Sequence, residues 1–184
     1  MMTENDIVKG CKQGWREAQR ALYDVHAPHL MAIALRYMGD RDDAQDVLQD
    51  ALIKAYQSIA QFNWKGQGSL QAWLDRIVIN TAVSQLRHLR NHPSQVDVDQ
   101  LADDAEQPDT SDVAAIDSAT ILAMVASLPD GYRTVFNMHC IDGFSHRDIA
   151  RQLGISEGTS SSQLSRARAI LAHKIKEYIN QHAP

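Results

Sequence analysis

The segment SHRDIARQLGISEGTSSSQLSRARAIL, residues 145–171, decides the fold of the C-terminal half of this 184-residue chain. Ser145 followed by Asp148 has the spacing of a helix capping box. Gly154 is placed to end that helix in the left-handed conformation, and Ser156 is placed to cap the next one. The segment therefore predicts two short helices joined by a tight turn, which is a helix-turn-helix.

The second helix of this pair predicts a DNA-reading surface. Leu164, Ala167 and Leu171 recur with helical spacing and predict its buried side. Small hydroxyl residues permit close approach to a major groove, and arginine makes bidentate contacts to guanine. The candidate DNA-binding residues on the opposite side are Ser161, Ser162, Ser165, Arg166 and Arg168. Arg168 is better placed for phosphates. A solvated helical hairpin without a DNA partner is the alternative.

The charge is distributed unevenly along the chain. A net charge of −5 argues at first against a nucleic-acid partner. Residues 93–115 hold 7 Asp/Glu and no Lys/Arg, however, whereas residues 1–92 and 116–184 each carry a net +1. The acidic stretch contains Pro93 and Pro108 and lacks aromatic residues, so it predicts a flexible linker. The expected fold is all-α, with two small helical domains, an N-terminal bundle (1–92) and the helix-turn-helix domain (116–184), joined by this flexible acidic linker.

Helical signals also dominate the N-terminal half. Residues 15–37 carry apolar residues at helical spacing, and Asp40 is a good N-cap for the next helix. In that helix an apolar stripe runs from Val47 to Ile59, opposite a polar face. The segment FNWKGQGS then breaks the pattern with two glycines. Its last residue, Ser69, is expected to cap a third long helix. No stretch alternates with the period of two that is typical of a strand, so no sheet is expected.

Three of these segments resemble a known family. LPDGYRTVFNMHCIDGFSHRDIARQLGISEGTSSSQLSRARAIL (128–171) is similar to the promoter-reading C-terminal domain of the extracytoplasmic-function sigma factors, a subfamily of the sigma-70 family. DAQDVLQDALIKAY (43–56) and GSLQAWLDRIVINTAVSQLR (68–87) resemble the other conserved domain of that family. The matches occur in the family's order and flank a variable linker. The resemblance implies a transcription initiation factor that binds core RNA polymerase and directs it to specific promoters.

The resemblance also implies roles for individual residues. Residues 1–92 correspond to sigma region 2, which binds polymerase and melts the −10 element, and residues 116–184 to sigma region 4. The residues implied to dock on the clamp of the polymerase beta-prime subunit are Asp46, Gln49, Asp50 and Lys54. Those implied to hold the −10 element are Phe62, Asn63, Trp64, Lys65 and Asn80. The serine–arginine face would read the −35 element, and residues 128–140 would lie near the beta-subunit flap.

The residue types suit these roles. An aromatic loop beside Lys65 could stack on the unpaired base that DNA melting exposes. Core packing is the alternative for the aromatic residues; Trp73 is assigned mostly to the core, whereas Trp64 stays open between the two. The family usually has an apolar residue at the position of Ser160, so this serine is expected to weaken the core contact of the reading helix.

Other chemistry finds little support in the sequence. Neither of the close histidine pairs has a third ligand at a familiar spacing, so no metal and no cofactor are expected. Phosphate-binding glycine motifs and a nucleophile elbow are absent, so the chain is not expected to be an enzyme. The competing functions are a helix-turn-helix regulator that acts without polymerase and a helical interaction protein that does not bind DNA.

The remaining expectations concern partners and location. Members of the family are often held inactive by an anti-sigma factor, so such a protein is a candidate partner alongside polymerase and promoter DNA. No segment has the roughly 18 to 20 apolar residues that membrane insertion requires. The N-terminus lacks a secretory signal, and Cys11 and Cys140 are isolated. These features favour a cytoplasmic protein.

Overall fold

The computed structural model describes residues 2–90 and 116–182, and every regular element within these ranges is a helix. The expected all-α class is therefore confirmed. The chain divides into two compact units, unit 1 (residues 1–86) and unit 2 (residues 87–184). The acidic linker expected over residues 93–115 lies outside the described residues.

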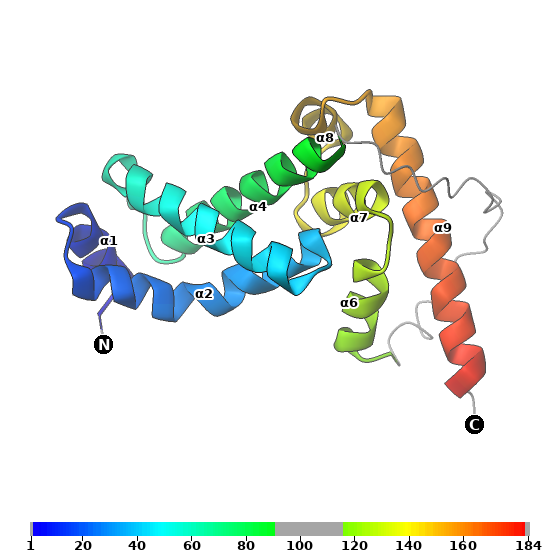
Figure 1. The fold of residues 1–184 in the computed structure, drawn as a ribbon, viewed down its shortest axis with the longest axis horizontal. Coiled ribbons are helices and arrows are strands. Elements are labelled where there is room, and N and C mark those ends of the chain that lie inside the picture. Colours follow the sequence, from blue (N-terminus) through cyan, green and yellow to red (C-terminus); the bar gives the residue numbers. More distant parts are fainter. Residues whose placement is uncertain (1, 91–115, 183–184) are drawn as a thin grey trace. The chain divides into compact units, whose positions relative to one another are not determined.

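Figure 1 shows the order of the helices along the chain. The first group comprises α1 (Glu4–Lys12), α2 (Arg16–Met38), α3 (Arg41–Ser58), the short 3-10 helix η1 (Ile59–Gln61) and α4 (Ser69–Arg90). The second comprises α6 (Ser118–Ala126), α7 (Asp130–Phe136), the π-helical turn η2 (Asn137–Ile141), α8 (His146–Leu153) and α9 (Glu157–His182).

The core of unit 1 is built from apolar faces of α1, α2, α3 and α4. Side chains that are at most 3% exposed include Ile7, Leu22, Leu30, Val47, Leu70, Leu74 and Val78. The local signals at the junction of α2 and α3 act as expected. Gly39 ends α2 in the left-handed conformation, and the Asp40 carboxylate accepts hydrogen bonds from the N–H groups of Asp42 and Asp43.

The sequence pattern does not predict α1, which begins at a capping box. The Thr3 hydroxyl accepts from the N–H of Asp6, and the Asp6 carboxylate accepts from the N–H of Thr3, both at 3.2 Å. The Thr3 hydroxyl also donates to the Asp6 carboxylate at 2.6 Å, and this bond, together with the one from the Thr3 N–H, lowers the pKa of Asp6. α1 packs closely on α2, because a Cβ added at Gly10 would lie 2.5 Å from the Cβ of Ala18. The missing side chain at Gly10 is thus what permits the approach.

The core of unit 2 joins α9 to α6 and α7. Its buried residues are Val125, Leu128, Ala167, Ile170 and Leu171, with Met124, Tyr132 and Phe136 packed against them. Three of the buried residues come from α9, on the side that the sequence pattern assigns to the core. The opposite side of that helix is left to solvent.

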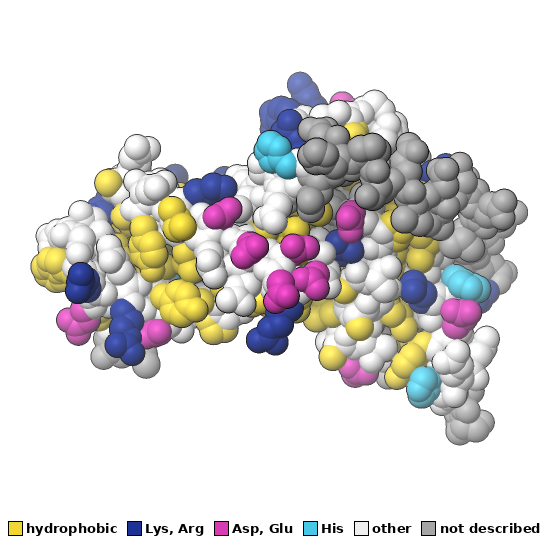
Figure 2. All heavy atoms as spheres, viewed as in Figure 1, with side chains coloured by type: hydrophobic (Ala, Val, Ile, Leu, Met, Phe, Trp, Pro, Cys, Tyr) yellow, Lys and Arg dark blue, Asp and Glu magenta, His cyan; other side chains and the backbone are white. Residues whose placement is uncertain are grey.

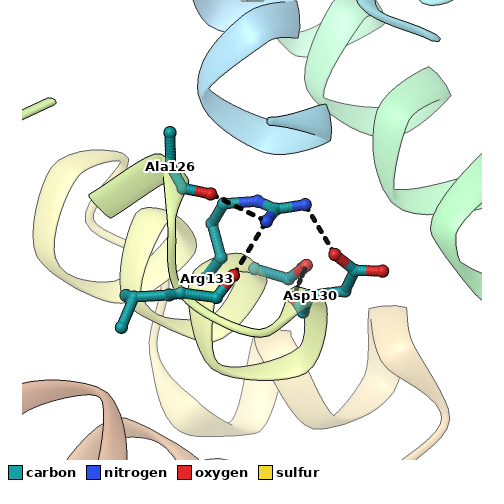
Figure 3. Close-up of polar contacts among 5 residues, drawn as sticks. Ala126, Asp130 and Arg133 are labelled. Carbon is teal, nitrogen blue, oxygen red and sulfur yellow. Dashed lines mark hydrogen bonds and ion pairs between the residues drawn. The ribbon is translucent and has the colours of Figure 1, made fainter. Parts of the chain in front are cut away.

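A buried arginine ties α6 to α7. Arg133 is 5% exposed, and its Nη1 donates to the carbonyl oxygens of Ala126 at 3.1 Å and Leu128 at 2.8 Å. Its Nη2 pairs with Asp130 Oδ1 at 2.7 Å, as Figure 3 shows. Ala126 is the last residue of α6, so the guanidinium supplies donors where the helix leaves carbonyl groups unpaired.

Replacing Arg133 with alanine should destabilise unit 2 by about 2–4 kcal/mol, because buried carbonyl groups lose their donor. Hydrogen exchange at the amides of α9 would measure the loss. The control is Arg151→Ala, whose partner Asp148 lies 2.8 Å away in an exposed pair. Such a pair contributes less than about 1 kcal/mol. Equal losses in the two variants would contradict the role given to Arg133.

Candidate nucleic-acid interface

α8 and α9 form the expected helix-turn-helix, and each local signal acts where the sequence places it. α9 spans 26 residues, however, so the expectation of two short helices is wrong for the second one. The Ser145 hydroxyl accepts from the N–H of Asp148 at 3.1 Å and begins α8. Gly154 ends that helix with φ +67°. The Ser156 hydroxyl accepts from the N–H of Thr159 at 2.9 Å and begins α9. The turn is therefore fixed by hydrogen bonds within the segment itself.

One face of α9 is exposed and polar. The predicted DNA-binding residues Ser161, Ser162, Ser165, Arg166 and Arg168 are all exposed. Arg166 Nη1 lies 3.4 Å from the Tyr132 hydroxyl on α7, and Arg168 Nη2 lies 3.8 Å from Cys140 Sγ on η2. The structure thus brings the five residues to one helix, and each arginine also reaches a neighbouring element.

Ser160 lies on the opposite side of α9 and is fully buried. Its Oγ is 2.9 Å from Nδ1 of His146, and the His146 ring stacks on His139 with 4.4 Å between ring centroids. His139 Nδ1 in turn lies 3.0 Å from the carbonyl oxygen of Phe144. A buried hydroxyl is costly only when it lacks a partner. Ser160 therefore gives the helix-turn-helix a polar link where an apolar residue would give a packing contact.

The polar face predicted on α3 is exposed and acidic. Asp46, Gln49 and Asp50 are all exposed, and Figure 2 shows acidic side chains gathered over this helix. Lys54 is also exposed, but its Nζ donates to Oγ1 of the buried Thr81 on α4 at 3.1 Å. Lys54 thus links α3 to α4.

Ile53 is a residue of this face that the sequence pattern misses. It is 53% exposed among the acidic side chains of α3. The spacing in the sequence could have indicated this position, because Ile53 lies four residues after Gln49 and three after Asp50 and so falls on their side of the helix. A groove between α2 and α3 runs beside this surface. It is lined by Tyr23, Pro28, Met31, Leu48, Gln49 and Leu52, among others.

The loop from Phe62 to Gly68 is here called the α3–α4 loop. The residues predicted to hold the −10 element, most of which lie in it, differ in their exposure to solvent. Phe62 is only 8% exposed, and its ring centroid lies 4.8 Å from that of the half-buried Trp73. Phe62 is therefore not offered to a DNA base in this structure. The exposed members of the set are Asn63, Trp64, Lys65 and, on α4, Asn80. Trp64, which the sequence left between core and surface, is 41% exposed.

The histidines of α2 make polar contacts with α4. His26 Nδ1 lies 2.6 Å from Gln71 Oε1, and His29 Nε2 lies 3.2 Å from Asp75 Oδ1. Within residues 2–90 and 116–182, no three His, Cys, Asp or Glu side chains are grouped so that they could hold a metal ion. In the same ranges, no helix combines the length and apolar character needed to cross a membrane.

Comparison with known proteins identifies both halves of the chain. The family described as "Sigma-70 region 2" matches residues 22–92, and "Sigma-70, region 4" matches residues 118–171. ECF RNA polymerase sigma factor SigM of Mycobacterium tuberculosis is 33% identical over 169 residues, which cover 91% of this chain and 81% of the relative. The chain belongs to the extracytoplasmic-function (ECF) family of RNA polymerase sigma factors. As a member of this family, it is an initiation factor that binds core RNA polymerase and directs it to specific promoters.

Further relatives of this sigma factor agree with the assignment. The ECF RNA polymerase sigma-E factor of Haemophilus influenzae is 28% identical in a match that covers 95% of this chain and 96% of the relative. The sigma factor RpoE from Bartonella quintana, solved in complex with the anti-sigma factor NepR, is similar with a TM-score of 0.50 and 27% identity. That match covers 85% of this chain and 96% of the RpoE chain. A regulator that acts without polymerase is not favoured by these relatives.

The cap of α8 gives the sigma factor a measurable electrostatic signature. The Ser145 hydroxyl, which donates to Asp148 at 2.6 Å, lowers the pKa of that carboxyl, and Arg151 lowers it further. Because the pKa of Asp148 is lower in the folded state, its stabilising effect is present above the ordinary value of 3.8. The effect is lost as the pH falls below that value and through the folded-state pKa.

The variant Ser145→Ala should cost about 1 kcal/mol of stability in unit 2, the usual effect of losing an N-cap. It should also return the pKa of Asp148 toward 3.8. Chemical denaturation and an NMR titration of the Asp148 carboxyl would measure the two effects. Ser161→Ala is the matched control, since this exposed serine lies inside α9. An Asp148 pKa that is unchanged in Ser145→Ala would show that the Ser145 hydroxyl is not a cause of the shift.

Proposed function

We propose that the two units of this sigma factor divide the recognition of a promoter. Unit 1 binds core polymerase through α3 and holds the melted −10 element with α4 and the α3–α4 loop, while α9 of unit 2 reads the −35 element. The observation that best supports this division is that each sigma-70 region carries an exposed face of suitable chemistry. The protein acts by binding and catalyses no reaction, and it works in the cytoplasm beside the DNA.

The polymerase surface of the proposal is centred on Ile53. Asp46, Gln49 and Asp50 lie on the same face of α3, within two turns before this exposed side chain. An apolar centre within a polar rim is the usual anatomy of a protein interface, and its charges set the partner and the association rate. Lys54 contributes by joining this helix to Thr81 of α4, so that polymerase binding and DNA binding involve connected helices.

The −10 surface uses the exposed part of the α3–α4 loop. Trp64 offers a ring on which an unpaired base can stack, and Lys65 offers a positive charge to the backbone phosphates. Asn63 and Asn80 are suited to hydrogen bonds with base edges. Phe62 takes a supporting part in this proposal, because its buried ring fixes the start of the loop against Trp73.

The −35 surface uses the first half of α9. Ser161, Ser162 and Ser165 permit close approach to a major groove, where Arg166 can reach a guanine and Arg168 a phosphate. Each surface is small, so neither is expected to bind a promoter tightly alone. Core polymerase would hold both surfaces at promoter spacing, and the second contact then forms at a high effective concentration.

Two further partners belong to the proposal. Residues 128–140, which include α7, would lie near the flap of the polymerase beta subunit. The relative RpoE was solved in complex with the anti-sigma factor NepR, and we extend that class of partner to this chain. An anti-sigma factor that covered Ile53 and the acidic residues before it on α3 would exclude polymerase from the same surface.

The first test is run-off transcription with core polymerase, in which the wild-type chain should produce promoter-dependent transcripts. The variant Asp50→Arg should weaken binding to core polymerase at least about tenfold, because it reverses a charge on the proposed docking face. Glu17→Arg, an equal charge reversal in the exposed first turn of α2, is the control. Unchanged polymerase affinity in Asp50→Arg would remove α3 from the interface.

A second test separates base contacts from phosphate contacts on α9. Arg166→Ala should cost about 1–3 kcal/mol in binding by the holoenzyme, confined to one base pair of the −35 element. Arg168→Ala should weaken binding by a similar factor on every −35 sequence and reduce the salt dependence. Titrations on a set of single-base promoter variants would measure both. A uniform loss in Arg166→Ala would reassign this arginine to a phosphate.

A further inference from the structure

Glu4, in the first turn of α1, binds the start of α4. Its Oε2 accepts a hydrogen bond from the N–H of Gly68, and its Oε1 accepts one from the N–H of Leu70, both at 2.6 Å. The two partners lie more than sixty positions away in the sequence. The match to sigma-70 region 2 begins at residue 22, so α1 lies outside it. Figure 1 shows α1 at the end of unit 1 where the chain passes from α3 into α4.

The start of α4 needs an acceptor from elsewhere. The first N–H groups of a helix have no partner within it, and the helix dipole makes this end favourable for a carboxylate. Gly68, with φ +86°, has no side chain to supply one. The Ser69 hydroxyl serves the loop instead, since it accepts from the N–H of Lys65 at 3.2 Å and donates to the carbonyl of Gly66 at 2.6 Å.

The carboxylate of Glu4 is itself held in place by the packing of α1. Ile7 and Val8 are at most 3% exposed, and Gly10 lies against Ala18 and Trp15 of the next segment. α1 also packs on η1, the element immediately before the α3–α4 loop. Glu4 therefore extends to α4 from a helix that is itself packed in place. Its two hydrogen bonds are charge-assisted, which makes them stronger than bonds between neutral groups.

We propose that Glu4 is a positioning residue for promoter melting. It fixes the end of the α3–α4 loop, while the buried ring of Phe62 fixes the start, so Asn63, Trp64 and Lys65 are presented between two anchors. A loop ordered before it meets the DNA loses less conformational entropy on binding the single strand. This inference rests on the proposed role of the loop in holding the −10 element.

The first experiment examines the free sigma factor by hydrogen exchange. In Glu4→Ala, exchange at the amides of Gly68 and Leu70 should be roughly tenfold faster, because each loses a charge-assisted bond. Glu4→Gln, which keeps one neutral acceptor oxygen, should give an intermediate rate. Exchange in α2 and α3 should not change. Unchanged exchange at Gly68 and Leu70, or faster exchange throughout unit 1, would overturn the proposal.

The second experiment measures promoter opening by the holoenzyme, on a promoter that the wild-type enzyme selects from a random library. Glu4→Ala should slow opening of the duplex roughly tenfold, with unchanged affinity for core polymerase. Glu4→Gln should recover part of the rate. Glu17→Ala, an exposed glutamate in the first turn of α2, is the matched control and should open the promoter at the wild-type rate. A wild-type opening rate in Glu4→Ala would end the inference.

The variant Trp64→Ala separates this inference from the function on which it rests. If Trp64→Ala opens the promoter normally, the proposed role of the loop fails, whatever Glu4 does. If Trp64→Ala is slow and Glu4→Ala is not, the loop keeps its role and only the part of Glu4 is wrong. If both are slow and the double variant is little slower than Trp64→Ala, Glu4 acts through the loop, as proposed.

Discussion

Helix ends leave backbone N–H and C=O groups unpaired, and each unit of this protein relies on a charged side chain from another helix to pair them. In unit 1 the carboxylate of Glu4, on α1, accepts from the first N–H groups of α4. In unit 2 the guanidinium of Arg133, on α7, donates to carbonyl groups at and after the end of α6. Both interactions place a full charge at the end of a helix that favours its sign. Each one fixes how two helices meet.

The links in unit 1 bear on the proposed function because they lie next to surfaces proposed for promoter and polymerase. The α3–α4 loop is short and glycine-containing, yet Phe62 and Glu4 fix its two ends. Lys54 joins the acidic face of α3 to Thr81 of α4, one residue after Asn80. Polymerase bound to α3 as proposed would therefore contact a helix that is hydrogen-bonded to the one proposed to hold single-stranded DNA.

In the helix-turn-helix, a buried hydrogen bond between side chains also fixes how two helices pack. Ser160 occupies a position where the family usually has an apolar residue, and its hydroxyl lies against His146, whose ring stacks on His139. We expected Ser160 to weaken the packing of α9 because a serine makes less apolar contact than the usual residue. A paired hydroxyl restores part of that contact and requires a specific orientation of α8. α9 is thus held by both packing and hydrogen bonding.

The sequence by itself determined the helix-turn-helix, the end of α2, both ends of α8, the start of α9, and the family, because caps and glycine stops act within a few residues. Only the tertiary structure decided that Phe62 is buried, that Ile53 is exposed within an acidic face and that Lys54 bonds to Thr81. It also gave the cap of α4 to Glu4, where the sequence pattern favoured Ser69. Local sequence signals indicate which residue types can pair the free backbone groups at a helix end. Which distant side chain arrives there depends on how the helices pack, and no short-range pattern records that.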